Sequence, residues 1–443
     1  MLAHDGSGPW TKTPVEVWEH IIFFAVTLDA SSNANFPIFD ARCTPSIYLA
    51  FKRTCGDHHS QVYPSPAYTE TERTRRTLRL VCRSWNAVVS QWQLRKRWLR
   101  LYASKEEIPD EMWMGALRIE FREASAPVNW EPEEVGLDRV TKWINRWSEI
   151  GPLRLQRLEL LRVTVVTFHG IFAALCGASA ALPHLRSLSL YIPNHYLGVT
   201  RRLSRHFPQL RHLTFDLNIL SDGPLAWDVK QLKEAQNVKE LERAMDDTLD
   251  LPNLETLFLF SASHLPTLRN WHLPNLRHVH IQPTHSYWDE IVHPFLLRHA
   301  STIQTLDLDD CTIGASGILT NTMHIDSKVF EEGFWDNFPS LQLLRCALQH
   351  ITTAGLPGPK HPLRYIVDTD PISETSGFVH VLKTWVDGLP EGKYLDSIVL
   401  YGSYLSRRDF EYERGEVQRL LRLLRWNGTK LCNPAGKLWI EPL

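Results

Sequence analysis

The sequence predicts an α+β protein in which a small all-α module precedes an irregular α/β solenoid of stacked repeats. Two amphipathic-helix signatures, within residues 13–25 and 69–92, indicate the module. A nine-residue apolar motif that recurs as far as Leu400 indicates the repeats. At 443 residues the chain is long enough to contain both parts.

These patterns divide the chain into five segments. Residues 1–12 form a tail, and residues 13–102 form the helical module, which is split by an insert at about 28–77. Residues 103–152 are a linker with a candidate degenerate first repeat. The repeats occupy residues 153–405, and residues 406–443 are a capping segment.

The first helix signature begins at Thr13, which can cap a helix whose first residue is Pro14. Glu16 lies three residues after Thr13 and completes a capping box. The apolar side chains that follow have the spacing of one helical face. They are Trp18, Ile21, Ile22 and Ala25.

The second signature starts with another candidate capping box, made by Thr69 and Glu72. A long apolar stripe follows, made of Leu78, Val81, Cys82, Trp85, Val88, Val89 and Trp92. A stripe of this length on a small domain predicts one buried edge and an apolar surface left for a partner.

The insert between the two signatures has the composition of a loop. Its prolines are Pro37, Pro45, Pro64 and Pro66. Because the entropy of loop closure grows only logarithmically with length, the flanking helices can still pack together. Its metal-ligand residue types are Cys43, Cys55, His58 and His59. Their spacing matches no zinc motif, so unliganded loop residues are the better interpretation.

Each repeat places apolar residues at the first, fourth and sixth positions of the motif. The copies are Leu155-Leu158-Leu160, Leu185-Leu188-Leu190, Leu210-Leu213-Phe215, Leu254-Leu257-Leu259, Leu276-Val279-Ile281, Ile303-Leu306-Leu308, Leu341-Leu344-Cys346, Leu363-Ile366 and Leu395-Ile398-Leu400. Alternation over a few residues, followed by a longer return segment, predicts a short strand in each copy. Since no unit can bury its apolar side alone, we expect neighbouring units to stack.

Both ends of the repeat region have further signals. Ala116, Ile119 and Phe121 predict a degenerate strand, and the 140–147 stretch predicts its return helix. Residues 416–424, rich in Leu and Arg, predict a helix that caps the last repeat. We favour capping over a membrane or calmodulin-type role for this helix.

If the apolar positions of the motif point inward, the third, fifth and seventh positions point outward along the strands. The candidate substrate-binding residues on this face are Tyr191, Phe258, Phe260, His278, His280, Asp307, Asp309 and Tyr401. Phe258 and Phe260 either form a binding patch or belong to the interior under a long loop. His278, His280 and Asp307 are metal-ligand types without a fourth ligand, so a polar recognition surface is the better interpretation.

Composition and motif content argue against several classes of function. A formal net charge of -2 argues against general nucleic-acid binding. The seven scattered cysteines contain no Cys-x-x-Cys pair and favour free thiols in a reducing compartment. No secretory signal or membrane span is recognisable, so we expect a cytoplasmic and/or nuclear protein. No catalytic or cofactor-binding motif is present, so we expect neither an enzyme nor a cofactor.

The two helix signatures and the repeats together resemble the F-box family with leucine-rich repeats. The matching F-box residues are Pro14, Glu16, Ile21, Ile22, Leu80, Val81, Cys82, Arg83 and Trp85. The Val-Cys-Arg-Ser-Trp string is fairly specific, whereas the Thr-Pro-Val-Glu start alone is weak. In that family the two halves normally lie close together, and here the insert separates them.

The resemblance implies a substrate-recognition adaptor of an SCF (Skp–cullin–F-box) ubiquitin ligase. It implies docking to a Skp-family adaptor, and through it to a cullin, by Pro14, Glu16, Trp18, Ile21, Ile22, Leu78, Leu80, Val81, Cys82 and Trp85. The repeats would then bind a protein substrate of unknown identity. One alternative is a leucine-rich-repeat scaffold without ligase association, and another is a metal-dependent enzyme.

Overall fold

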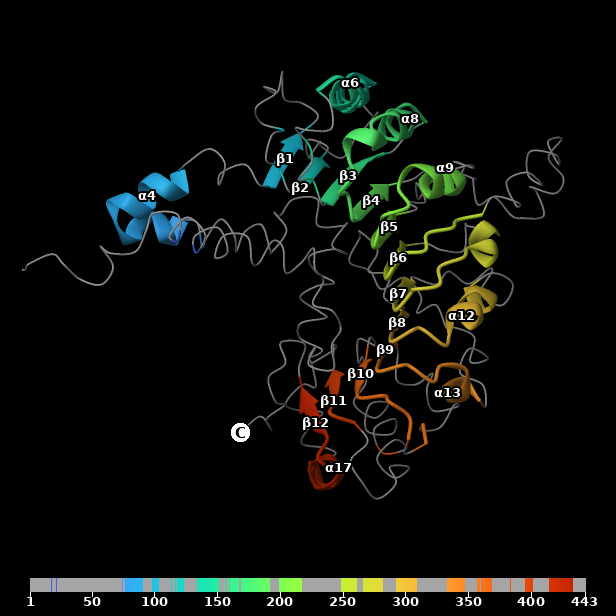
Figure 1. Cartoon of the computed structure of the whole chain (residues 1–443). Coiled ribbons are helices and arrows are strands. Elements are labelled where there is room, and N and C mark those ends of the chain that lie inside the picture. The colour runs from blue at the N-terminus through green and yellow to red at the C-terminus, as the bar shows by residue number, and fades with distance from the viewer. Residues whose placement is uncertain are drawn as a thin grey trace, which may run out of the picture.

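The computed structural model describes most of the strand-bearing part of the chain. The described residues are 17, 21, 74, 76–90, 98–102, 113, 116, 118–122, 134–150, 155, 158, 160–166, 169–191, 199–216, 248–260, 266–281, 292–308, 333–346, 357–358, 360–368, 383, 395–400 and 414–432. They form a mixed α/β structure built on one open parallel sheet, whose strands follow an arc (Figure 1). No helix among these residues is long and apolar enough to cross a membrane.

The described strands form a twelve-stranded sheet in which every strand pairs with its neighbours in chain order. All pairs are parallel. The strands are β1 (Trp98–Tyr102), β2 (Arg118–Arg122), β3 (Leu160–Val166), β4 (Ser187–Tyr191), β5 (His212–Asp216), β6 (Thr256–Phe260), β7 (His278–Ile281), β8 (Thr305–Leu308), β9 (Leu343–Cys346), β10 (Tyr365–Asp368), β11 (Ser397–Leu400) and β12 (Lys430–Cys432).

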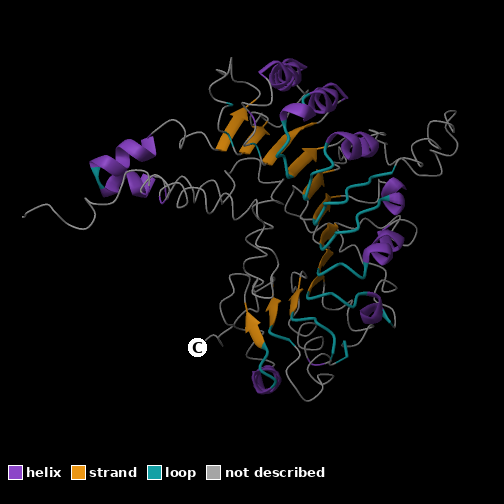
Figure 2. Cartoon of the chain, in the orientation of Figure 1, coloured by secondary structure: helices purple, strands orange, loops and turns teal. Residues whose placement is uncertain are grey.

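The helices between these strands lie along the convex side of the arc (Figures 1 and 2). They are α6 (Glu134–Ile150), α8 (His169–Gly177), α9 (Val199–His206), α12 (His293–His299), α13 (Phe334–Asn337) and α17 (Arg414–Trp426), with 3-10 turns η3 (Ser179–Ala181) and η5 (Pro266–Asn270). Helix α4 (Arg83–Ser90) precedes the sheet and stands apart from it in Figure 1.

The hydrophobic core lies between the sheet and the outer helices. Its central row contains one apolar residue from each strand, and the members pair in register across the sheet. The row is Leu99, Ile119, Leu161, Leu188, Leu213, Leu257, Val279, Leu306, Leu344, Ile366, Ile398 and Leu431, all buried. The repeated apolar motif therefore encodes one continuous core, because each strand covers the apolar side of the strand before it.

Aromatic side chains fill the core beneath the first strands. On α6, Trp143 and Trp147 are spaced four residues apart, so they lie on the same helical face. The rings of both stack on Phe121 of β2, with centroids 5.9 and 5.8 Å away. Trp113 meets Trp147 edge-on at 5.5 Å. This confirms the degenerate strand at Ala116, Ile119 and Phe121 and the helix predicted to return from it.

The Leu-Pro and Phe-Pro dipeptides mark a turn that precedes several strands. In the unit before β6, the N–H of Leu254 donates to the carbonyl of Leu251 at 3.1 Å. The residue after the proline then reaches back to the preceding unit. The Asn253 amide donates to the Pro208 carbonyl at 3.1 Å, and the Asn275 amide to the Pro252 carbonyl at 2.6 Å. These bonds link successive turns, and their acceptors are turn carbonyls that take no part in strand pairing.

The structure corrects the register of the first predicted copy. The expected positions were Leu155, Leu158 and Leu160, but Leu161 pairs with Leu188 in the core row. The N–H of Leu158 donates to the Leu155 carbonyl, as Leu185 does to Leu182 in the next unit. The copy is therefore displaced by three residues, and its core positions are Leu158, Leu161 and Val163.

The sheet extends beyond the repeat range of 153–405. It includes β1 and β2 on one side, and β12 with the packed helix α17 on the other. Leu420, Leu421 and Leu424 of α17 are buried, while Arg422 and Arg425 are exposed. The helix predicted at residues 416–424 is thus present and packs by its apolar face at the end of the sheet.

We predict that the asparagine bonds between turns stabilise the stack measurably. Replacing Asn253 or Asn275 by Ala should each lower the free energy of unfolding by about 1 kcal/mol, because a side-chain hydrogen bond to a backbone carbonyl is lost. Urea unfolding followed by tryptophan fluorescence measures the change. Asn145→Ala on the exposed face of α6 is the control and should be neutral or slightly stabilising. Equal losses in all three variants would contradict the prediction.

Candidate functional site

The strand face opposite the core carries a second row of side chains in register. From β2 to β10 the row reads Glu120, Arg162, Ser189, Thr214, Phe258, His280, Asp307, Arg345 and Val367. This is the face on which the outward positions of the motif were predicted. It is more polar than the core row, and several of its members are nevertheless buried.

The structure brings four of the predicted substrate-binding residues together on β6, β7 and β8. Phe258, His278, His280 and Asp307 are all buried, with exposed fractions of 3%, 6%, 1% and 0%. Tyr191 and Phe260 lie in strands β4 and β6, where each pairs with Asp216 of β5. Asp309 and Tyr401 lie outside the described residues.

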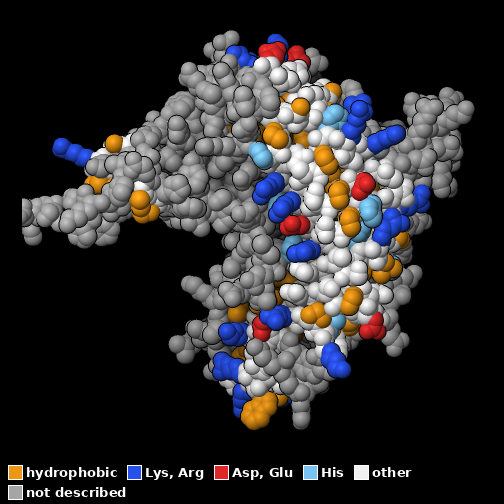
Figure 3. All heavy atoms as spheres, in the orientation of Figure 1, with side chains coloured by type: hydrophobic (Ala, Val, Ile, Leu, Met, Phe, Trp, Pro, Cys, Tyr) orange, Lys and Arg blue, Asp and Glu red, His pale blue; other side chains and the backbone are white. Residues whose placement is uncertain are grey.

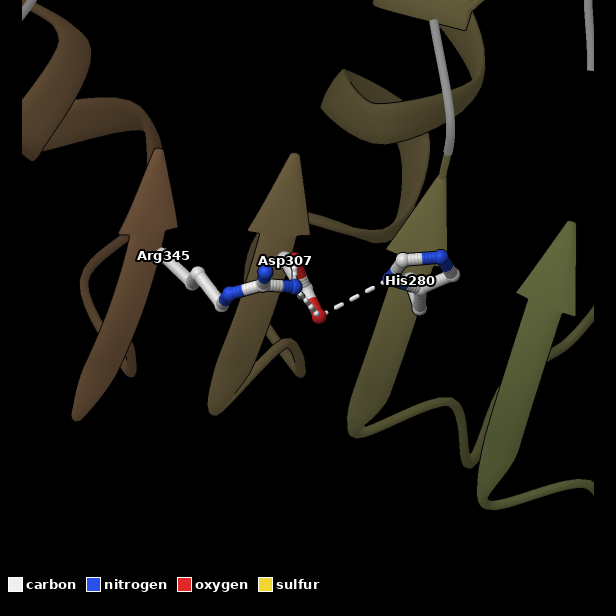
Figure 4. A network of polar contacts seen from close by, with 3 residues as sticks. All are labelled: His280, Asp307 and Arg345. Atoms are coloured by element: carbon white, nitrogen blue, oxygen red, sulfur yellow. Dashed lines mark hydrogen bonds and ion pairs between the residues drawn. The ribbon is translucent and has the colours of Figure 1, made fainter. Parts of the chain in front are cut away.

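A buried ionic network joins three adjacent strands at this face (Figure 4). Nη1 of Arg345 on β9 lies 3.0 Å from each carboxylate oxygen of Asp307 on β8. Nδ1 of His280 on β7 lies 2.8 Å from Oδ2 of Asp307, a close polar contact between the imidazole and the carboxylate. The carboxylate of Asp307 therefore sits between a guanidinium and an imidazole.

Charge balance explains why these residue types occur together. A carboxylate removed from water is strongly destabilised unless a positive group and hydrogen bonds compensate. Arg345 remains charged at any ordinary pH, so the Arg345–Asp307 pair is neutral overall. The interpretation of His278, His280 and Asp307 as metal ligands gains no support, since no metal-holding group of His, Cys, Asp and Glu occurs among the described residues.

Phe258 extends the network by ring contact. Its ring lies 5.4 Å from the His280 imidazole, with an interplanar angle of 37°. Its burial agrees with the second of the two interpretations given above, in which this aromatic belongs to the interior. It nevertheless lies across the sheet from the core row, because Thr214 and His280 are its register partners.

His278 occupies the neighbouring row and is held neutral. Its Nδ1 lies 3.2 Å from Oγ1 of Thr305 on the next strand. Burial, and to a smaller extent the charge of Arg277, lower the pKa of His278 to about 3. At neutral pH this side chain is therefore an uncharged hydrogen-bonding group.

A separate candidate surface precedes the sheet, around α4. Leu80 and Val81 expose 85% and 56% of their surface, whereas Trp85 is half-buried. The helix predicted as one long stripe is interrupted at Cys82, after a helical segment at residues 76–81. We call Leu80, Val81 and Cys82 the docking patch.

The interruption at Cys82 has a local cause in hydrogen bonding. Sγ of Cys82 accepts the N–H of Trp85 at 3.4 Å, so the thiol caps the start of α4. Nε of Arg79 donates to Oδ1 of Asn86 at 2.9 Å and ties the two helical segments across the break. The patch therefore lies at the break between two helical segments that hydrogen bonds link to each other.

The remaining predicted docking residues have mixed placements. Ile21 is exposed, as is Val17 one turn before it. Leu78 is half-buried. Pro14, Glu16, Trp18 and Ile22 lie outside the described residues, as do Cys43, Cys55, His58 and His59 of the insert.

No protein-family model matches this chain, and no curated protein matches it significantly.

We predict that removing Asp307 destabilises the fold strongly. Asp307→Asn leaves the buried Arg345 guanidinium without its counter-charge, which should lower the free energy of unfolding by about 3–5 kcal/mol. Thermal or urea unfolding measures the loss. Glu255→Gln, which breaks the exposed 3.7 Å Arg211–Glu255 pair, is the control and should cost about 1 kcal/mol or less. Similar losses in the two variants would contradict a special role for the buried pair.

We predict a pH dependence of stability that belongs to His278. Its pKa is about 3 when folded and near 6.5 when unfolded, so the unfolded chain binds more protons between these values. The free energy of unfolding should therefore rise with pH across this window and level off above it. His278→Thr, the residue at the same row position on β6 and β8, should flatten the slope by up to about 1.4 kcal/mol per pH unit. Urea unfolding from pH 4.5 to 7.5 tests this, and an unchanged slope would refute it.

Proposed function

We propose that the chain is an F-box-type substrate receptor of an SCF ubiquitin ligase, with a leucine-rich-repeat solenoid as its substrate domain. The N-terminal helices would dock a Skp-family adaptor, and the solenoid would hold a protein substrate. No bond chemistry is assigned to the chain itself. Its role would be positioning, because binding raises the effective concentration of substrate lysines near the charged ubiquitin enzyme.

The docking patch is the observation that carries the proposal. Apolar side chains in the sheet are buried almost completely, whereas Leu80 and Val81 are exposed side by side. They immediately precede the Cys-Arg-Ser-Trp residues on which the F-box resemblance rests. Apolar side chains held together in water are typical of a surface that a partner covers.

Two features of the sheet support a repeat solenoid. Its strands are parallel and follow chain order, which is the arrangement produced when similar units stack one after another. The Leu-Pro-Asn-Leu turns before β6 and β7 have the same hydrogen bonds in both units. A strand, a turn and an outer helical or looped return thus form the repeated unit.

Adaptor binding tests the proposal directly. The full chain, purified alone, is immobilised and challenged with a Skp-family adaptor. Leu80→Asp/Val81→Asp should weaken capture by about a hundredfold or more, because a charge replaces each apolar contact at the centre of the interface. Leu297→Asp is the matched control, since Leu297 on α12 is also an exposed apolar residue. It should bind like the wild type.

Three outcomes are informative. Loss of binding in the docking-patch variant alone supports the receptor. Equal binding by all three proteins shows that the patch is not the docking surface. Failure of the wild type to bind overturns the ligase assignment and leaves a leucine-rich-repeat scaffold.

A further inference from the structure

A column of side chains, fully or partly exposed, runs along the starts of the strands. It consists of the residue just before each strand, which is the second position of the motif. From β4 to β11 the column reads Arg186, Arg211, Glu255, Arg277, Gln304, Gln342, Arg364 and Asp396. Figure 3 shows basic side chains, with an acidic one among them, gathered beside the middle strands.

The backbone of the column is held rigidly. The N–H of Arg211 donates to the Arg186 carbonyl at 2.8 Å, and the next N–H, of His212, donates to the same carbonyl at 2.9 Å. In the same way, the N–H groups of Glu255 and Thr256 donate to the Arg211 carbonyl at 2.8 and 3.0 Å. The N–H groups of Arg277 and His278 donate to the Glu255 carbonyl. Each carbonyl thus accepts two donors, so the spacing of the backbone positions from which the side chains project is set before any partner binds.

The column is positively charged and exposed where its arginines gather. Arg186, Arg211 and Arg277 are exposed and immediately precede β4, β5 and β7. Glu255 lies between the last two and contacts Arg211 at 3.7 Å, a weak pair at this exposure. Among the described residues, neither Arg186 nor Arg277 has a carboxylate partner for its side chain. This part of the column therefore has three guanidinium groups and only one carboxylate. The excess positive charge is available to bind an anionic ligand.

We call Arg186, Arg211 and Arg277 the arginine column, and we propose that it binds an acidic, extended segment of a partner protein. Neighbouring strands are about 4.8 Å apart, so Arg186 and Arg277, three strands apart, are separated by about 14 Å. An extended chain advances about 3.3 Å per residue, so carboxylates at alternate positions of a five-residue stretch span about the same length. Such a segment would cross the strands along the column and meet all three guanidiniums.

A protein segment fits this surface better than a nucleic acid does. Glu255 stands in the middle of the column and would repel a continuous phosphate backbone, whereas a peptide can place a neutral or donor residue there. Gln304 and Gln342 continue the column with groups that donate to and accept from an amide backbone.

This inference deepens the proposed function, on which it rests, by naming acidic segments as the substrate class. It does not require the docking patch, which lies in a different part of the chain. The test below is therefore run on the full chain without any adaptor, and its failure is distinguishable from failure of adaptor capture.

Fluorescence anisotropy with a labelled peptide of alternating Asp and Ser provides the measurement, and the corresponding Asn-Ser peptide provides the neutral comparison. Arg186→Gln/Arg211→Gln/Arg277→Gln should weaken binding of the acidic peptide by about tenfold or more, because all three charge contacts are lost. Arg201→Gln/Arg202→Gln/Arg205→Gln on α9 removes the same charge from an exposed site outside the column and should change it by less than about twofold.

Glu255→Gln guards against misfolding as the explanation. Removing the one carboxylate among the arginines should tighten binding by about twofold or more, and a misfolded protein would not gain affinity. Equal losses in the two triple variants would reduce the effect to net charge and overturn the proposal. Undetectable binding by the wild type would also overturn it, as would column-dependent binding of a single-stranded oligonucleotide without binding of the peptide.

Discussion

The register of the parallel sheet is the constraint on which every other feature depends. Side chains alternate between the two faces of a strand, so a slip of one residue would place the core leucines in the polar row. The doubly used carbonyls at the strand starts, such as that of Arg186, oppose such a slip. The same register brings Asp307 between His280 and Arg345 and aligns the exposed arginines. One backbone pattern thus sets the core, the buried network and the surface column together.

The strands were predictable because their signal is local. Leu185, Leu188 and Leu190 suffice to mark β4, and a proline turn announces it. The first copy was misplaced because the motif fits two registers, one with Leu155, Leu158 and Leu160 and the other with Leu158, Leu161 and Val163. Only pairing with Leu188 shows that Leu161 faces the core. Strand β1 was missed because its alternation of apolar and polar residues is short and directly follows an amphipathic-helix pattern.

The candidate sites were less predictable, because they depend on contacts between distant residues. The motif indicated that Phe258 and His280 share a face, but it could not indicate whether that face is covered. Asp307 and Arg345 are 38 residues apart, and their pairing follows only from the register of β8 and β9. The arginine column occupies the second position of the motif, which can be read from the sequence. That its members line up on the surface follows only from the stacking of the turns in the structure.

The buried network and the exposed column illustrate opposite uses of charge on the same strands. Asp307 and Arg345 satisfy each other out of water, so together they favour one register and offer little to a ligand. Arg186 and Arg277 keep their charge in water, where each gains little from its neighbours and much from an incoming carboxylate. In the proposed substrate receptor this division would be useful, because a stiff sheet would keep the backbone that carries the recognition groups at constant spacing. A bound segment would then be held at a defined position in the assembly, which is what delivery of substrate lysines to a separate enzyme requires.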